Sequence, residues 1–563
     1  MARTATIRIE GRYAWLSMSP SKRAVKDDLE QAFTWVNPSD LADSKEYYAR
    51  RSGQMLHGLA WKAKEILERH NYKVRCEMPK VPAHKKAEHW KITKPPRSVN
   101  QKLLADAVDE GLWGSFVGPP AIGKTYILAY LAAAARNTTL IVSYQRKPNA
   151  QVAEAFSKFT NFADDVIRLD ANNSVPDGYV LNGPKVIVAT IQKLAAMRRR
   201  KDPFYRQIVK KTKLLLFDEA HHAKADGGIM LLEDLDRLVS CGGVTATWKT
   251  TDGKEIQLEG VVGPIRAQVK LEDAIDEGDV CPTTLHVATV PPRYYFMEDP
   301  KDARKRKKAE KQDLGGGMTA GAVLDASEEP EVDRFTRLQQ FLFVERDYVI
   351  NGSTGRNEII ASFVERMRRK GRTGVIIINR LDHAVELCKI IPGLVPLLAS
   401  KVGDIKPVKG EVRDALIHKL EHRHKDCDWV VSTTFDEAVN VPTLDCVVLA
   451  ASGKSDIKLE QRMRNTRSFN GDLETGYYCK RRGHTLLLRD QCDFLGSHAK
   501  TNLANMRRIL QAHPANKEET FNDTIPSISP SSWSPQRAAK AFRKWQASNP
   551  RKPRRAKKRT GWG

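Results

Sequence analysis

The sequence predicts an α/β protein with two doubly wound parallel-sheet lobes, an N-terminal accessory domain and a disordered basic C-terminal tail. The first observation is a glycine-bounded loop, Gly118-Pro119-Pro120-Ala121-Ile122-Gly123-Lys124-Thr125, between an apolar run and an alanine-rich segment. The second is the run Leu214-Leu215-Leu216-Phe217, which is followed by Asp218-Glu219-Ala220-His221. The third is the alternation of short apolar runs with helix-forming stretches, which indicates parallel sheets covered by helices.

The loop at 118–125 has the G-x-x-x-x-G-K-[ST] spacing of a phosphate-binding loop. Its glycines allow backbone N–H groups to point inward around phosphates, and Lys124 can reach the β- and γ-phosphates. The hydroxyl group of Thr125 is suited to ligate Mg²⁺. The order of strand, loop and helix that the motif requires is present, because 114–117 is apolar and 126–135 is rich in alanine.

Two acidic residues follow the apolar run at 214–217. Such a run is typical of a buried parallel strand, whose carboxyl end would present Asp218 to the Mg²⁺ ion. Glu219 stands beside it and can activate a water molecule for attack on the terminal phosphate. Two acids alone would be typical of a solvated strand end, but together with the upstream loop they predict nucleotide hydrolysis.

The pattern divides the chain into five parts. They are an N-terminal accessory domain (1–90), a first lobe (91–295), a charged linker (296–344), a second lobe (345–500) and a basic, largely disordered tail (501–563). The accessory domain is expected to hold strands around Ile7, Ile9 and Tyr13 and a helical region at 49–68. Strands of the first lobe are expected at 115–117, 139–142, 185–189, 214–217 and 243–246. Strands of the second lobe are expected at 373–378, 429–432, 446–450 and 485–488.

The formal net charge of +25 predicts a polyanionic partner such as nucleic acid. From Arg537 to the end, the tail carries eleven Lys or Arg and no acid, with Trp545 and Trp562 interleaved. This composition favours a nucleic-acid anchor over a purely solubilising extension. No apolar run approaches the roughly 20 residues needed to span a bilayer, so we expect a soluble intracellular protein of the cytoplasm or nucleoid, without a membrane partner.

In their order and spacing, these motifs resemble those of superfamily 2 helicases and translocases. They are most similar to the branch of UvsW-type recombination helicases, XPB-type repair helicases and the motors of type I and type III restriction enzymes. The resemblance covers about residues 95–490. It implies two RecA-like lobes, ATP and Mg²⁺ as cofactors, and nucleic acid as the partner; a viral or phage origin agrees with it.

The resemblance implies roles for further residues of the first lobe. Gln101 matches the glutamine that contacts adenine, and Thr190 matches a strand-end threonine whose hydroxyl group touches the nucleic-acid backbone. His221 would sense the state of the γ-phosphate. Thr245-Ala246-Thr247 resembles the T-A-T motif that couples hydrolysis to movement, so Thr245 and Thr247 are implied to relay that signal.

The resemblance continues in the second lobe. The segment 432–442 is similar to the T-x-x-x-E-G-x-D-x-P motif, which implies coupling or nucleic-acid roles for Glu437 and Asn440. Asn440 replaces an aspartate, so it can bond a ribose hydroxyl but carries no charge. Residues 461–467 resemble Q-R-x-G-R-x-x-R without its glycine, which makes Arg464 and Arg467 candidate arginine fingers, with Arg462 as the substitute if the register is shifted.

The sequence thus leads us to expect an ATP-dependent helicase or translocase acting on branched or duplex DNA in recombination, repair or replication. Replication or recombination proteins are the implied protein partners. DNA is favoured over RNA because the T-A-T motif, Asp252-Gly253 and the segment 271–282 are similar to those of the DNA-acting branch, an argument by analogy. The alternatives are the duplex-translocating motor of a restriction or packaging system, an RNA helicase, and an ATP-switched nucleic-acid binding protein. No feature indicates a role for residues 1–90.

Overall fold

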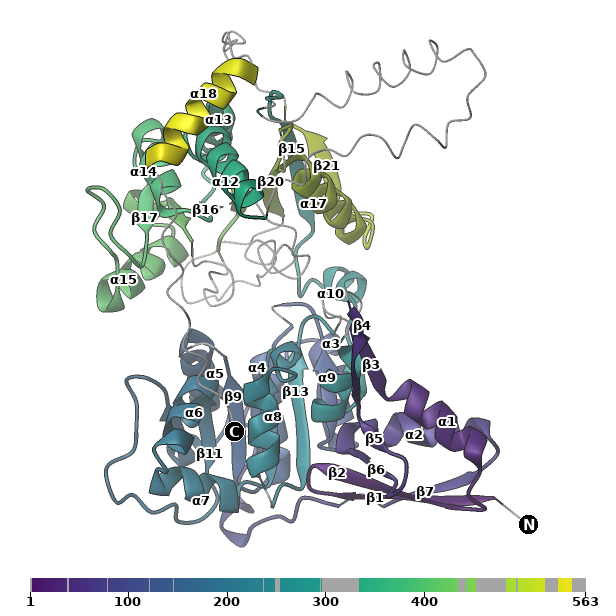
Figure 1. Ribbon diagram of the computed structural model, residues 1–563. Helices are drawn as coiled ribbons and strands as arrows, with labels where there is room; N and C mark the ends of the chain where they lie inside the picture. Colours follow the sequence, from purple (N-terminus) through teal and green to yellow (C-terminus); the bar gives the residue numbers. More distant parts are fainter. Residues whose placement is uncertain are drawn as a thin grey trace, which may run out of the picture. The chain divides into compact units, whose positions relative to one another are not determined.

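The computed structural model describes residues 3–37, 40–77, 79–120, 122–144, 146–235, 237–248, 254–293, 295, 334–433, 441, 443–451, 482–492, 495–521 and 535–548. These residues form two compact units (Figure 1). The first contains the described residues up to Pro282, and the second contains those from Thr283 onward.

The first unit begins with a small α/β module. Its elements are β1 (Thr4–Glu10), β2 (Tyr13–Ser19), α1 (Arg23–Ala32), β3 (Thr34–Asn37), β4 (Asp40–Glu46), β5 (Tyr48–Ala49), β6 (Gln54–Leu56), α2 (Ala60–Arg69) and β7 (Lys73–Glu77). Five of the strands form a sheet in the order β5-β6-β2-β1-β7, and β3 and β4 form a separate hairpin. The strands expected around Ile7, Ile9 and Tyr13 are confirmed. The helix expected over 49–68 is wrong at its start, because the chain forms β5 and β6 before α2 begins at Ala60.

The rest of the first unit is a lobe built on a seven-stranded parallel sheet in the order β10-β11-β9-β12-β13-β8-β14. The strands are β8 (Gly114–Val117), β9 (Thr139–Ser143), β10 (Val166–Leu169), β11 (Val186–Thr190), β12 (Leu214–Asp218), β13 (Ser240–Thr245) and β14 (Ile265–Gln268). The helices are α3 (Val99–Asp109), α4 (Lys124–Ala135), α5 (Arg146–Phe159), α6 (Ile191–Arg199), α7 (Pro203–Lys211), α8 (Asp226–Asp234), α9 (Glu255–Val262) and α10 (Leu271–Asp276). All five strands expected here are confirmed to within a few residues.

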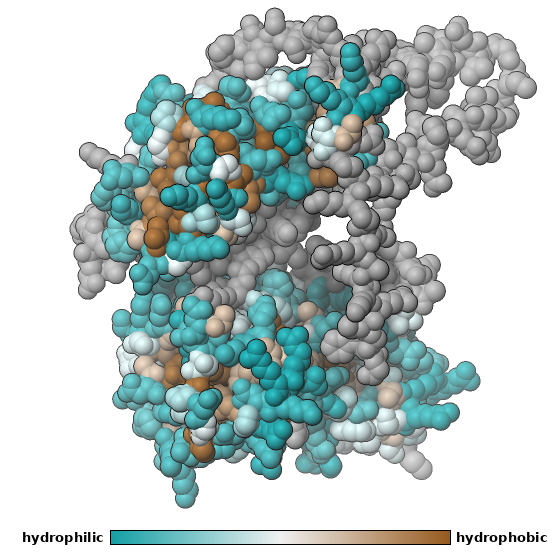
Figure 2. All heavy atoms as spheres, turned by 60° about the vertical axis from the view of Figure 1, so that its left-hand side comes forward, coloured by the Kyte–Doolittle hydropathy of each residue, from teal (hydrophilic) through white to brown (hydrophobic). Residues whose placement is uncertain are grey.

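Strand β12 shows why a continuous apolar run folds into the middle of this sheet. Leu214 and Leu216 face the core formed with α3, α4 and α5, whereas Leu215 and Phe217 face the core formed with α6 to α9. Alternate side chains are therefore buried on opposite faces, which is the arrangement of a parallel strand covered by helices on both sides. The face of the first unit drawn in Figure 2 is mainly hydrophilic, as expected for the outer side of a helical layer.

The N-terminal module packs directly on the first lobe. The Arg12 guanidinium donates a hydrogen bond to the Glu233 carbonyl oxygen at 2.6 Å. Gly58 lies so close to α9 that a Cβ atom at this position would stand 1.9 Å from the Glu259 carbonyl oxygen. Module and lobe therefore share one compact unit.

The second unit is another α/β lobe on a seven-stranded parallel sheet, in the order β17-β18-β16-β19-β20-β15-β21. Its strands are β15 (Thr283–Thr289), β16 (Gly374–Ile377), β17 (Val395–Leu397), β18 (Trp429–Ser432), β19 (Cys446–Leu449), β20 (Gly483–Arg489) and β21 (Lys517–Thr520). Its helices are α12 (Arg334–Val344), α13 (Arg356–Arg369), α14 (Leu381–Ile390), α15 (Gly410–Glu421), α17 (Leu495–Leu510) and α18 (Pro535–Ser548). The two parallel sheets confirm the predicted fold class of two doubly wound, RecA-like lobes.

The structure changes the expected limits of the lobes. Residues 283–289 fall within 91–295, the range expected for the first lobe, but they form β15, which pairs with β20 and β21 in the second sheet. The range expected as a linker, 296–344, contains α12 in its last part. An apolar run indicates that a strand will form, but it carries no information about which sheet the strand will join.

Part of the range 501–563 is also folded. Strand β21 pairs with β15 at the edge of the second sheet, and α18 packs on α12. The ring of Phe343 on α12 contacts the rings of Phe542 and Trp545 on α18, with centroids 5.6 and 6.0 Å apart. Trp545, expected among bases, thus lies within an aromatic cluster, and Lys540, Arg543 and Lys544 are exposed.

Candidate functional site

The phosphate-loop motif lies between the buried strand β8 and the start of α4. Gly123 ends the loop with a φ of 92°, in the left-handed region that favours glycine. A Cβ atom at Gly123 would stand 2.0 Å from the Gln101 Nε2 atom, so any residue with a side chain at this position would displace the Gln101 amide. Gln101 is buried, donates from Nε2 to the Ile122 carbonyl oxygen at 3.4 Å, and accepts at Oε1 from the Arg97 N–H at 2.8 Å.

The polar groups of the loop surround the amino end of α4. No side chain caps this helix, so its first-turn N–H groups face the loop and provide a positive end suited to an anion. The Lys124 Nζ atom donates to the Gly118 carbonyl oxygen at 3.4 Å, which holds the ammonium group over the loop. Thr125 follows in the first turn of the same helix. Among the predicted loop residues, Ala121 lies outside the described residues.

The two predicted acids stand at the carboxyl end of β12. Burial first, and then the charge of the Glu219 carboxylate, raise the pKa of Asp218 to about 7, while the Lys124 ammonium group acts in the opposite direction. Glu219 has a φ of 54°, a left-handed conformation that costs a residue with a side chain about 1–3 kcal/mol. Such strain is concentrated at functional sites, where the surrounding structure holds it in place.

The donor atoms at this site fit a magnesium ion. The Thr125 hydroxyl and the Asp218 carboxylate supply oxygen ligands, which Mg²⁺ prefers. Burial, and then the neighbouring Glu219 carboxylate, disfavour the charged form of Asp218 and raise its pKa, and a divalent cation would stabilise that charged form.

His221 and Thr245 connect the acids to the neighbouring strand β13. The His221 Nδ1 atom lies 3.1 Å from the Thr245 hydroxyl oxygen and 3.4 Å from the Glu219 Oε2 atom. The same hydroxyl group donates to the Thr247 carbonyl oxygen at 2.9 Å and accepts from the Thr247 N–H at 3.3 Å. The Thr245 carbonyl oxygen accepts from the Gly118 N–H at 3.0 Å. Thr245 therefore contacts three parts of the site: the phosphate loop, the turn that carries Glu219 and His221, and Thr247 of the T-A-T motif.

Thr190 and Tyr144 stand at the same carboxyl edge of the sheet. The Thr190 hydroxyl is the N-cap of α6, where it accepts from the Lys193 N–H at 3.4 Å. The predicted contact of this hydroxyl with nucleic acid stays a prediction. The sequence reading missed Tyr144, whose hydroxyl donates to the His222 carbonyl oxygen at 2.5 Å. Its position directly after β9 was the available signal, because parallel strands present functional side chains at that end.

The predicted residues of the second lobe cannot be placed in this site. Glu437, Asn440, Arg464, Arg467 and Arg462 all lie outside the described residues. Their roles therefore stay predictions from the sequence. The described geometry unites the loop, the acids, His221 and the T-A-T residues within the first unit alone.

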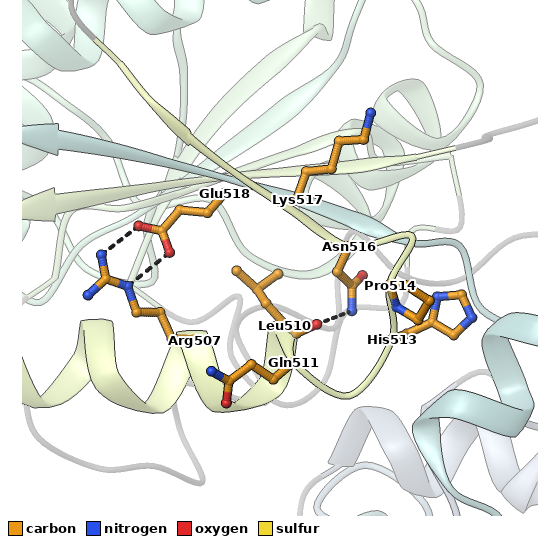
Figure 3. Close-up of a pocket in the computed structure, with 8 residues that line it drawn as sticks. All are labelled: Arg507, Leu510, Gln511, His513, Pro514, Asn516, Lys517 and Glu518. Carbon is orange, nitrogen blue, oxygen red and sulfur yellow. Dashed lines mark hydrogen bonds and ion pairs between the residues drawn. The ribbon is translucent and has the colours of Figure 1, made fainter.

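A hollow of about 570 Å³ lies in the second unit, between the end of α17 and β21 (Figure 3). It is bordered by an ion pair in which Arg507 donates to both carboxylate oxygens of Glu518, at 2.9 and 2.7 Å. None of the predicted site residues that the structure describes lines it. In the described part of the chain, we find no helix with the length and apolar character needed to cross a membrane.

A family model and a viral protein are similar to parts of this chain. Residues 98–250 match the family model described as type III restriction enzyme, res subunit. Over 285 residues the chain is 26% identical to putative helicase 22 of Sulfolobus islandicus filamentous virus (isolate Iceland/Hveragerdi), a match that covers 50% of this chain and 44% of that protein. The matched region thus spans less than half of that relative's length.

Solved structures similar to this chain include T4 UvsW, at 16% identity and a TM-score of 0.38, over 92% of this chain and 99% of the other. Another is a fragment of a putative HsdR subunit of a type I restriction enzyme from Vibrio vulnificus YJ016. Its identity is 13% and its TM-score is 0.47, over 75% of this chain and 67% of the other.

Proposed function

We propose that this chain is a superfamily 2 helicase or translocase that hydrolyses ATP in its first lobe to move along or separate nucleic-acid strands. The observation that carries this proposal is the connected cluster at the carboxyl edge of the first sheet. In it, Gly118 of the phosphate-type loop, Glu219 and His221 all contact Thr245, and Asp218 stands next to Glu219 at the end of β12. The match of residues 98–250 to a restriction-motor family supports the same class of activity.

Each group of the cluster has a distinct task in this proposal. Lys124 and the first-turn N–H groups of α4 hold the phosphates of ATP. Thr125 and Asp218 would hold Mg²⁺, which neutralises charge on the phosphates when it is bound. Glu219 accepts a proton from the water molecule whose oxygen bonds to the γ-phosphorus, as the bond from that phosphorus to the departing ADP oxygen breaks.

His221 and Thr245 would transmit the state of the nucleotide. Because the His221 ring lies within 3.4 Å of the Glu219 carboxylate and 3.1 Å of the Thr245 hydroxyl, a shift of Glu219 on hydrolysis changes both contacts. Thr245 is also bonded to the loop through its carbonyl oxygen. We propose that this path converts loss of the γ-phosphate into movement of the T-A-T segment.

The second lobe would complete the catalytic site. Arg464 and Arg467 are proposed to stabilise the charge that develops on the γ-phosphoryl group in the transition state. Glu437 and Asn440 are proposed to couple this lobe to nucleic acid. These assignments rest on the sequence motifs. Replacement of Arg464 or Arg467 by Ala should lower kcat far more than ATP affinity.

DNA is the proposed substrate, with recombination, repair or replication as the setting. The net charge of +25 supports a nucleic-acid partner of either kind, and the choice of DNA rests on the T-A-T motif. Contacts through phosphates would give little sequence preference.

The test is the rate of ATP hydrolysis with single-stranded, duplex or branched DNA and with RNA, using Lys124→Ala as the background control. Stimulation by DNA alone, with strand displacement, is the expected result. Stimulation by duplex without strand displacement would identify a duplex-translocating motor, and stimulation by RNA alone an RNA helicase. ATP binding without stimulated turnover would identify a nucleic-acid binding protein switched by ATP. A wild-type rate equal to that of Lys124→Ala would contradict the proposed hydrolysis.

A further inference from the structure

Within the described part of the chain, one face of the five-stranded sheet of the N-terminal module is uncovered. Helices α1 and α2 pack on one side of the five-stranded sheet, where Ile7, Ala14 and Leu16 are buried with them. Figure 1 shows no other labelled element over the opposite side of β1, β2 and β7. Side chains alternate along each strand, so every second residue of β1, β2 and β7 projects from this uncovered side.

An exposed tryptophan stands in the middle of that face. Trp15 on β2 keeps 38% of its surface exposed, which is unusual for so large an apolar side chain. Its neighbour on the same side is Tyr13, with the two ring centroids 6.4 Å apart. Arg8 on β1 is the direct cross-strand partner of Trp15. Two aromatic rings thus lie beside an arginine on a solvated surface.

The charged side chains around Trp15 have a positive excess. Arg8 and Arg75 have 62% and 79% of their side-chain surface exposed. Glu77 pairs with both, at 3.2 Å to Arg8 and 3.4 Å to Arg75, so one carboxylate is shared by two guanidinium groups. Lys73 adds a further positive charge on β7, and Glu10 a negative charge that lies 3.6 Å from Arg8.

Polar uncharged groups complete the surface. Thr6 of β1 is paired with Ser17 of β2 and with Arg75 of β7, and Gln54 of β6 is the other cross-strand partner of Trp15. We call the set Thr6, Arg8, Tyr13, Trp15, Ser17 and Arg75 the open face. Hydroxyl and guanidinium groups around isolated rings suit a polar, negatively charged ligand with flat rings of its own, and they suit an apolar protein partner poorly.

We propose that the open face binds single-stranded nucleic acid, with a base stacked on Trp15 and the adjacent phosphates held by Arg8 and Arg75. A sheet with helices on one side and aromatic side chains on the other can stack splayed bases, which a duplex does not offer. Because every base has a flat face, the binding is independent of sequence. This inference rests on the proposed action on nucleic acid and assigns to the N-terminal module the capture of a separated strand.

Binding of a fluorescent twelve-nucleotide oligothymidylate and of a blunt duplex, without ATP, tests the proposal. Trp15→Ala should weaken oligothymidylate binding by about tenfold or more, since stacking contributes roughly 1–3 kcal/mol per base. Trp15→Phe should restore most of the affinity. The matched control is Val36→Ala, which removes an exposed apolar side chain from another strand of the same module.

The charged part of the face is tested by salt titration. The double variant Arg8→Gln, Arg75→Gln should reduce the slope of log affinity against log salt by about 1.4, for two phosphate contacts to a single strand. Unchanged oligothymidylate affinity in Trp15→Ala would overturn the proposal, as would an equal loss of duplex affinity. The proposed function itself fails separately, when wild-type ATP hydrolysis shows no response to any nucleic acid.

Discussion

The Nδ1 atom of His221 lies 3.1 Å from the hydroxyl oxygen of Thr245. This contact joins the turn after β12 to the end of β13, and both residues are buried. The Thr245 hydroxyl also exchanges hydrogen bonds with Thr247, so one small side chain fixes the relation between two motifs that are 24 residues apart.

We expect Thr245→Val to uncouple ATP hydrolysis from strand displacement or translocation. The substitution keeps the shape but removes the hydroxyl group, so His221 loses its 3.1 Å contact and Glu219 a longer one at 3.5 Å, while the Gly118 N–H keeps its bond to the Thr245 carbonyl oxygen. Strand displacement or translocation should fall about tenfold or more relative to ATP hydrolysis, and stability should fall by about 1–3 kcal/mol. The matched control is Thr139→Val, a buried threonine at the other end of the same sheet. Equal losses in both variants would show that the role of Thr245 is structural.

Gly123→Ala should abolish ATP binding. The added Cβ would collide with the Gln101 amide at 2.0 Å, and the φ of 92° disfavours any residue with a side chain. The control is Gly178→Ala, because Gly178 also has a positive φ, of 76°, but nothing within 4 Å of the added atom. Titration with a fluorescent ATP analogue should show loss of affinity in the first variant only. Retained affinity in Gly123→Ala would contradict the packing of Gln101 against the loop.

The second lobe should lose stability as pH falls below about 6.5. Burial lowers the pKa of His286 to about 4, and that of His484 and of His383 to about 3. The nearby basic groups also lower these values, whereas Glu519 raises that of His286. In the unfolded chain these histidines bind protons near pH 6.5, whereas in the folded lobe they stay neutral until the pH is much lower. Their contribution to stability is therefore complete above pH 6.5 and is lost as the pH falls toward their pKa values in the folded lobe.

The loss amounts to at most about 1.4 kcal/mol per pH unit for each histidine. Urea unfolding of the full chain between pH 7 and pH 5 measures it. His484→Gln should flatten the dependence, because it removes one buried ring, and His424→Gln, which replaces an exposed ring, is the matched control. A dependence that is identical in wild type and His484→Gln would contradict the assignment.

We expect the two parts of the C-terminal region to have different roles: α18 packs on α12 of the second lobe, and the basic segment 551–563 contributes to nucleic-acid binding. Deletion of 551–563 removes seven Lys or Arg and should lower nucleic-acid affinity and its salt dependence. Deletion of 535–563 also removes α18 and uncovers Phe343, so it should destabilise the second lobe in addition. Comparison of unfolding midpoints and salt slopes separates the two effects. Equal midpoints in both deletions would contradict the docking of α18.

Sequence patterns predicted most of the strands whose side chains are buried on both sides. The run at Leu214–Phe217 indicated a covered strand, and its end located Asp218. Strand β21, with the sequence Lys517-Glu518-Glu519-Thr520, is exposed along its length and carries no apolar signal, so its pairing with β15 was missed. Such an edge strand forms because a neighbouring strand offers backbone hydrogen-bonding groups, which no local pattern records.

In the candidate site, too, the sequence predicted some features, and others became visible only in the folded structure. The motifs identified Lys124, Asp218 and Glu219 by type and spacing. The left-handed conformation of Glu219 and the N-cap role of Thr190 depend on tertiary contacts, so they appear only in the folded lobe.

The most direct test of the account is the ATP hydrolysis rate of Glu219→Gln at saturating nucleic acid and Mg²⁺, relative to wild type with the same amount of ATP bound. The amide keeps the size of the side chain but cannot accept the proton of the attacking water. We predict ATP affinity close to that of the wild type and a turnover rate lower by about 100-fold or more. Wild-type turnover in this variant would contradict the assignment of Glu219 and, with it, the catalytic site proposed for the first lobe.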